Sequence, residues 1–102
     1  MKKIVIAVSL FILGGTVAVY AHTPLCSCFD NGDNTVTCEG GFSDGSSASG
    51  VAVRVLDPAG KVLTDGKMDE NSEYTFDKPA GEFTVLFDAG EGHRIEVPGS
   101  EI

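Results

Sequence analysis

Short runs of alternating apolar and polar residues, separated by turn-forming residues, make up the chain after residue 21. The clearest run spans residues 51–56, where Val51, Val53 and Val55 would share one face of a strand. No stretch in this part follows the helical period. Strands of this length with closely spaced turn signals are typical of a β-sandwich. We therefore predict an all-β fold.

The turn signals divide this part of the chain into seven expected strands. By residue range these are 26–30, 35–39, 51–56, 61–63, 74–76, 83–88 and 95–97. The Asn31-Gly32 pair within residues 30–34 predicts a hairpin turn between the first two strands. The expected core residues are Val51, Val53, Val55, Leu63, Tyr74, Phe76, Phe83, Val85, Phe87, Ile95 and Val97. We expect residues 98–102 to form a loose tail.

The first 21 residues have the organisation of a secretory signal peptide. Two lysines precede an apolar run over residues 4–13, and Val19-Tyr20-Ala21 offers small residues at the positions that a leader peptidase requires. We expect cleavage after Ala21. The product would be a periplasmic or secreted protein that begins at His22 and forms a single domain over residues 22–102, with an N-terminal hairpin over 26–39.

An uncleaved membrane anchor is the alternative interpretation of the same segment. The apolar stretch over residues 4–21 nearly reaches the roughly 18–20 residues that span a bilayer. The Gly14-Gly15 pair interrupts this stretch, and together with the small residues before His22 it favours cleavage.

The chain is acidic, with 15 Asp and Glu against 7 Lys and Arg and a formal net charge of −8. The segment to be removed carries two positive charges and no negative ones, so the remaining domain would stand at −10. Nucleic-acid binding requires a basic surface and is therefore not expected. An acidic surface attracts cations weakly and without selecting a particular metal.

Three cysteines, Cys26, Cys28 and Cys38, would enter an oxidising compartment in which disulfides persist. An odd number leaves one thiol over. Cys26 and Cys28 share one face of their strand, and either can lie opposite Cys38, so the pairing stays open. Thiolates at Cys26 and Cys28 would alternatively be soft ligands for Cu(I) or zinc. We favour the disulfide, which would contribute about 2–3 kcal/mol by closing a loop of roughly a dozen residues.

Two histidines, His22 and His93, are the candidate nitrogen ligands. An N-terminal His22 would offer its α-amine and its imidazole to one cation, and such ligands suit copper, nickel, cobalt and zinc. The amine has an ordinary pKa of about 7.7–8.0, so a metal can displace its proton near neutral pH. His93 lies between Gly92 and Arg94, at the expected end of a sheet. The alternatives are a histidine that merely follows the cleavage site and a histidine in a surface loop.

Several strand and turn motifs resemble the carboxypeptidase-regulatory-like, or transthyretin-like, β-sandwich. They are Val53-x-Val55, Asp57-x-x-Gly60, Tyr74-x-Phe76 and Pro79-x-Gly81-x-Phe83-x-Val85. The fold that this resemblance implies is a small Ig-like or transthyretin-like sandwich, preceded here by a signal-peptide helix. Because that fold serves many functions, the resemblance implies no activity.

A narrower resemblance covers most of the exported part. It rests on the position of His22 after the signal and on six segments, the last of which ends in Gly-His-Arg. These are Phe42–Gly45, Val53–Val55, Gly66–Asn71, Tyr74–Phe76, Pro79–Phe83 and Asp88–Arg94. This order is similar to that of the small periplasmic components that accompany nickel and cobalt uptake transporters. The resemblance implies that the protein supplies a divalent metal to a membrane importer; the Cys-x-Cys pair is not part of it.

Enzyme chemistry has little support in the sequence. No nucleophile motif surrounds the serines of residues 46–49, no phosphate-binding glycine loop opens a helix, and no small-molecule substrate site is evident. Residues 30–34 carry oxygen ligands of the kind calcium prefers but lack the EF-hand pattern, which favours a plain turn. We therefore expect a non-enzymatic metal-binding accessory protein for nickel or cobalt. A metal-free envelope interaction module and a copper protein that uses His22 are the alternatives.

Overall fold

The computed structural model describes residues 23–102, so the expected signal peptide and His22 lie outside the described residues. The described part contains seven strands and a short 3₁₀ helix. In chain order these are β1 (Pro24–Asp30), β2 (Thr35–Phe42), β3 (Ala52–Leu56), β4 (Val62–Lys67), β5 (Glu73–Asp77), β6 (Thr84–Asp88), β7 (Arg94–Pro98) and η2 (Gly99–Glu101). None of the helical structure in residues 23–102 has the length and apolarity to cross a bilayer.

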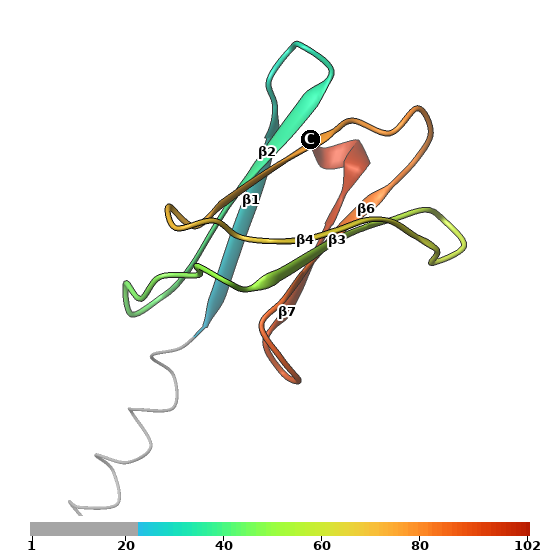
Figure 1. Cartoon of the computed structure of the whole chain (residues 1–102). Helices are drawn as coiled ribbons and strands as arrows, with labels where there is room; N and C mark the ends of the chain where they lie inside the picture. Colours follow the sequence, from blue (N-terminus) through green and yellow to red (C-terminus); the bar gives the residue numbers. More distant parts are fainter. Residues whose placement is uncertain (1–22) are drawn as a thin grey trace, which may run out of the picture.

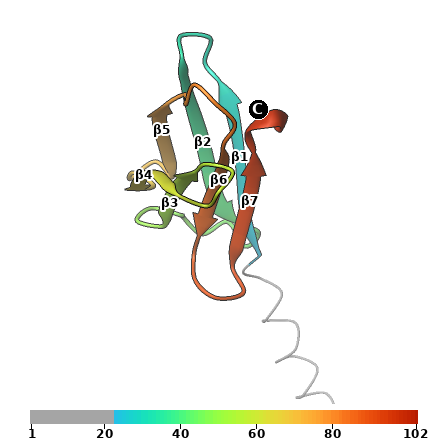
Figure 2. The same cartoon turned by 90° about the vertical axis from the view of Figure 1, so that its right-hand side faces the viewer.

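Two antiparallel sheets form the domain (Figure 1). One has the strand order β1-β2-β5 and the other β4-β3-β6-β7. The two layers face one another, and β1 lies beside β7 where their edges meet (Figure 2). The prediction of an all-β, two-sheet domain is confirmed.

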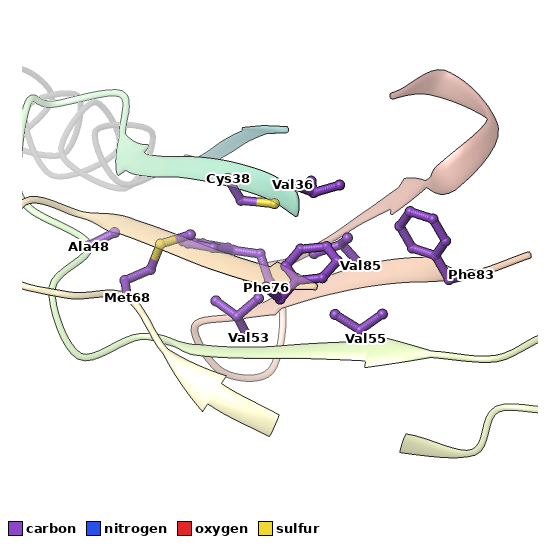
Figure 3. Close-up of a cluster of buried hydrophobic side chains, with 10 residues drawn as sticks. Val36, Cys38, Ala48, Val53, Val55, Met68, Phe76, Phe83 and Val85 are labelled. Atoms are coloured by element: carbon purple, nitrogen blue, oxygen red, sulfur yellow. The ribbon is translucent and has the colours of Figure 1, made fainter. Parts of the chain in front are cut away.

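The space between the sheets is filled by ten buried hydrophobic side chains (Figure 3). They come from both sheets and from three connecting segments, and they are Val36, Cys38, Ala48, Val53, Val55, Met68, Phe76, Phe83, Val85 and Phe87. In β3 and β6 the buried residues alternate with partly exposed ones, as the pleat of a strand requires. Full burial of each large side chain contributes about 1.5–3 kcal/mol.

Most of the predicted core is confirmed. The predicted residues that are buried are Val53, Val55, Phe76, Phe83, Val85 and Phe87, and those that are partly buried against them are Val51, Tyr74, Ile95 and Val97. The prediction for Leu63 is wrong, because its side chain is 45% exposed. Leu63 lies on the edge strand β4 at a register shift, where Val55 pairs with Thr64 and Leu56 with Val62, so Leu63 has no partner in β3.

The β1–β2 hairpin has the predicted turn. Asp30 accepts a hydrogen bond from the backbone N–H of Gly32 at 2.8 Å, and Asp33 accepts one from that of Thr35 at 3.1 Å. Gly32 and Asn34 have φ values of 82° and 73°, which glycine and asparagine tolerate best. These interactions fix the length of the turn and hence the register of the two strands.

Residues 98–102 make ordered contacts instead of forming the expected loose tail. Pro98 ends β7, and the N–H of Gly99 donates to the carbonyl oxygen of Phe83 at 2.8 Å. A Cβ on Gly99 would approach Cε1 of the Phe83 ring to 2.8 Å, so the chain here lies directly on that ring. Ile102 packs against the core, which closes this end of the sandwich.

Candidate metal centre

The turn between β6 and β7 positions His93. The N–H of Ala89 donates to the carbonyl oxygen of His93 at 3.0 Å, and the N–H of His93 donates to that of Gly90 at 2.8 Å. Gly90 and Gly92 have φ values of 114° and 80°, which side-chain-bearing residues rarely adopt. The two glycines around Glu91 are thus what allows so tight a turn to present His93.

Asp88 fastens the base of this turn. Its Oδ1 accepts hydrogen bonds from Nε of Arg94 at 2.9 Å and from the N–H of Gly90 at 3.0 Å, and its Oδ2 lies 3.1 Å from Nη1 of Arg54. The hydrogen bond from Arg94, followed by those from Gly90 and Arg54, lowers the pKa of Asp88 to about 2. Arg94 and Asp88 therefore pair with each other and hold the turn in place.

The His93 side chain is exposed, and one ring nitrogen has a partner. Nδ1 lies 3.3 Å from the carbonyl oxygen of Glu91. A carbonyl oxygen only accepts, so this hydrogen bond requires the proton on Nδ1. Nε2 then carries the free lone pair and is the atom through which His93 would bind a metal.

The start of β1 lies at the same end of the domain as the β6–β7 turn (Figures 1 and 2). The chain enters β1 at Thr23, whose N–H donates to Oγ of Ser43 at 3.1 Å and whose carbonyl oxygen accepts from the N–H of Ser43 at 2.8 Å. These two hydrogen bonds fix the position of the residue that directly follows His22. His22 itself lies outside the described residues.

The three cysteines lie together on the inner face of the β1–β2 hairpin. Cys28 is directly opposite Cys38, and the two form a disulfide with an S–S distance of 2.01 Å. The predicted disulfide is confirmed, and its pairing, which the sequence left open, is Cys28 with Cys38. Cys26 is the remaining thiol, and it is opposite Gly40. In the disulfide-bonded protein Cys28 has no thiolate to offer, contrary to its expected availability as a ligand.

Burial determines the chemistry of Cys26. Its side chain is half-buried, and desolvation raises the pKa of the thiol to about 11. At neutral pH Cys26 is therefore a protonated thiol of low reactivity. Its sulfur and those of Cys28 and Cys38 all lie within 4.8 Å of one another.

Among residues 23–102, these cysteines are the one cluster of three or more metal-ligating side chains of the His, Cys, Asp and Glu types. His93 does not belong to it. Aspartates in the turns accept hydrogen bonds from backbone N–H groups. Asp69, for example, accepts them from the N–H groups of Asn71 at 2.8 Å and Glu73 at 3.0 Å. In residues 23–102 the imidazole of His93 thus lies in a turn at one end of the sandwich, whereas the sulfur cluster lies on the inner face of a sheet.

The role of Asp88 was not predicted from the sequence. Its signal is the pattern Asp-x-Gly before the histidine, because a carboxylate two residues before a glycine can accept the N–H of that glycine. Comparison of the chain with protein-family models, with curated proteins and with solved structures finds no match.

Proposed function

We propose that this chain is an exported metal-binding accessory protein that offers a divalent transition metal, nickel or cobalt, to an uptake transporter in the membrane. The observation that carries the proposal is that the chain enters β1 at the end of the domain where the β6–β7 turn presents His93. Cleavage after Ala21 would make His22 the residue next to the fixed Thr23.

The ligands in this proposal are three nitrogen atoms. His22 supplies its α-amine and one imidazole nitrogen, and His93 supplies Nε2. Imidazole and amine nitrogens bind nickel, cobalt, copper and zinc, and they leave sites on the metal open for transfer to another protein. The similarity of the sequence to the periplasmic components of nickel and cobalt uptake, and to transthyretin-like domains, supports the choice of metal and the type of sandwich.

Copper is the competing metal for the same nitrogen ligands. Affinity for first-row divalent ions rises to a maximum at copper for a given set of nitrogen donors. A copper-binding role would therefore use His22 and His93 in the same way, and only the metal preference separates it from the proposal.

A metal-free interaction module is the second candidate, and a specific observation favours it. Leu25 and Phe29 lie in the edge strand β1 and are 50% and 43% exposed. Their positions alternate with Cys26 and Cys28, so they belong to the outer face of the sheet. Such side chains would contact an envelope partner without any metal.

Calorimetry on the exported protein tests the proposal. The protein is purified from the periplasm of a bacterial host under non-reducing conditions, its N-terminus is verified as His22 by mass spectrometry, and it is titrated with nickel, cobalt, copper and zinc. We expect one tight site per chain that is lost in His22→Ala, in His93→Ala and in a variant with one extra serine before His22.

Lys61→Ala in the β3–β4 turn is the matched surface control and should bind as the wild type does. Equal binding by the wild type and by the variant with the extra serine would refute the nitrogen site, because that site needs the free amine. In that case the interaction module becomes the better explanation, and Leu25→Ser with Phe29→Ser should then abolish capture of its partner.

A further inference from the structure

The sulfur cluster has a geometry that the nitrogen site does not explain. Cys26 and Cys28 lie two residues apart in β1, and Cys38 lies directly across from Cys28 in β2. All three sulfurs consequently project from the same face of the hairpin and lie within 4.8 Å of one another. A structural disulfide uses only two of them, and the third is kept at the same place as a thiol.

We propose that Cys26, Cys28 and Cys38 form a redox-gated site for one Cu(I) ion. In the oxidised protein the Cys28–Cys38 disulfide closes the site. In the reduced protein the three sulfurs together bind the ion as thiolates. This inference uses no residue of the proposed His22 and His93 site and does not depend on it.

The spacing of the sulfurs suits a three-coordinate ion. Metal–thiolate bonds of about 2.3 Å place the corners of a trigonal site about 4 Å apart. The three sulfurs already lie within 4.8 Å of one another, so the main change needed is opening of the Cys28–Cys38 bond. The backbone register that holds the sulfurs is fixed by the antiparallel pairing of β1 with β2.

Donor chemistry selects the ion. Soft thiolate ligands favour Cu(I), zinc and iron–sulfur clusters. Structural zinc is almost always bound by four ligands, and the cluster contains three cysteines without a His, Asp or Glu among them in the described residues. Three sulfurs without a fourth donor therefore match Cu(I) better than zinc.

The surroundings provide protection and access. Cys38 is fully buried and Cys26 is half-buried, which limits contact of both sulfurs with solvent. Cys26 is nevertheless only partly buried, and its strand β1 is at the edge of its sheet. The exposed part of the Cys26 side chain therefore gives a metal ion access to the sulfurs.

The gating step needs a dithiol reductant, such as a thiol–disulfide oxidoreductase. One thiolate of the reductant attacks the disulfide, a mixed disulfide forms, and the second thiol of the reductant resolves it. Two electrons and two protons pass to Cys28 and Cys38, and the reductant leaves as its disulfide. Cu(I) then displaces the thiol protons, which go to solvent, and no electron is transferred in that step.

The experiment compares oxidised and reduced protein without oxygen. The exported protein is reduced with dithiothreitol, the reductant is removed, and Cu(I) is titrated in competition with bathocuproine disulfonate. We expect one Cu(I) per chain in the reduced protein, a thiolate-to-copper absorption band in the ultraviolet, and no comparable binding by the oxidised protein. X-ray absorption should report three sulfur neighbours.

Cys26→Ser is the decisive variant, because it leaves the disulfide pair intact. Loss of even an outer-sphere partner weakens metal affinity by about 10–100-fold, so removal of a sulfur ligand should raise Kd at least about tenfold. Ser27→Ala, next to it on the outer face of β1, and His93→Ala should both bind Cu(I) as the wild type does.

Three results would overturn the proposal. They are equal Cu(I) affinity in the reduced wild type and in Cys26→Ser, equal affinity in the oxidised and reduced wild type, and loss of Cu(I) binding in His93→Ala. If reduction unfolds the domain, circular dichroism provides the test. One equivalent of Cu(I) must then restore the β-sheet spectrum of the oxidised protein, and failure to restore it also refutes the site. Failure here leaves the nitrogen site untouched, since that site is tested in oxidised protein with divalent ions.

Discussion

Gly40 provides the sharpest test of how the two sheets pack. It lies in β2 opposite Cys26, and its lack of a side chain leaves space for residues packed against this sheet. A Cβ at this position would lie 2.7 Å from Cε2 of Phe87, 3.1 Å from Cε of Met68 and 3.3 Å from Cβ of Ala48. All three of these neighbours are buried in the core.

The cost of Gly40→Ala follows from these distances. Carbon atoms in contact prefer a separation of about 3.5–4.0 Å, so the Phe87 ring or the β2 backbone must move by roughly 1 Å. Phe87 is fully buried, and protein interiors are close-packed, so its ring cannot move without displacing its neighbours. Overpacking of this kind lowers the free energy of unfolding by about 1–3 kcal/mol. In a domain of this size, each 1 kcal/mol corresponds to about 4–8 °C in Tm.

Gly41→Ala is the matched control, because it makes the same chemical change at the next position of the same strand. The nearest atom to its added Cβ is the carbonyl oxygen of Ser46 at 3.9 Å, which is an ordinary contact. Urea unfolding of both variants, followed by circular dichroism without reductant, measures the difference. We expect Gly41→Ala to stay within about 0.5 kcal/mol of the wild type. Equal stability of the two variants would refute the packing derived for Gly40.

Three further predictions concern the turn, the disulfide and the core. Because the pKa of Asp88 is lowered, its ion pairs stabilise the fold fully above the ordinary carboxyl pKa near 4, and this stability is lost as the pH falls toward 2. Asp88→Asn should therefore lose less stability than the wild type as the pH is lowered from 4 to 2. An equal loss in the two proteins would contradict the pairing. Reduction of the Cys28–Cys38 disulfide, which spans 10 residues, should lower the free energy of unfolding by about 2–3 kcal/mol in urea titrations, whereas no change would show that it adds no stability. Met68→Ala should lower the free energy of unfolding by about 2–5 kcal/mol in the same titration, because Met68 is buried. Leu63→Ala should lower it by less than about 0.5 kcal/mol, because Leu63 is exposed, and the reverse order would refute the core assignment.

Local alternation was sufficient to predict the strands that lie at the centre of the sheets. Val53, Val55, Val85 and Phe87 alternate with less buried residues, and all four are in the core. The burial of Met68 was not predictable in the same way, because it lies in a connection and is buried only when that connection crosses the core. Alternation also failed for Leu63, because the register of β4 shifts there: Val55 pairs with Thr64 and Leu56 with Val62, which leaves Leu63 without a partner in β3.

The pairing of the cysteines depends on the exact length of the β1–β2 turn, because a change of one residue shifts the register of the two strands. The turn places Asp30 opposite Val36, and Cys28 therefore falls opposite Cys38. A turn shorter by one residue would place Thr37 opposite Cys28 and would rotate β2 so that its buried residues face outward. Asn34, with its positive φ, is the residue that accommodates the longer turn. Composition predicts that a turn is present, but the exact register depends on its backbone geometry.

The two proposed sites differ in hardness and in position, and this separation limits competition between metals. The nitrogen donors would lie at the end of the sandwich, next to Thr23 and the β6–β7 turn, where ions can exchange with another protein. The sulfur donors lie on the inner face of the β1–β2 hairpin, where a disulfide between Cys28 and Cys38 normally closes the site. Nickel and cobalt prefer the first set of donors and Cu(I) the second. Because the two sites share no residue, Cu(I) loading of reduced protein should leave the divalent affinity of the nitrogen site unchanged.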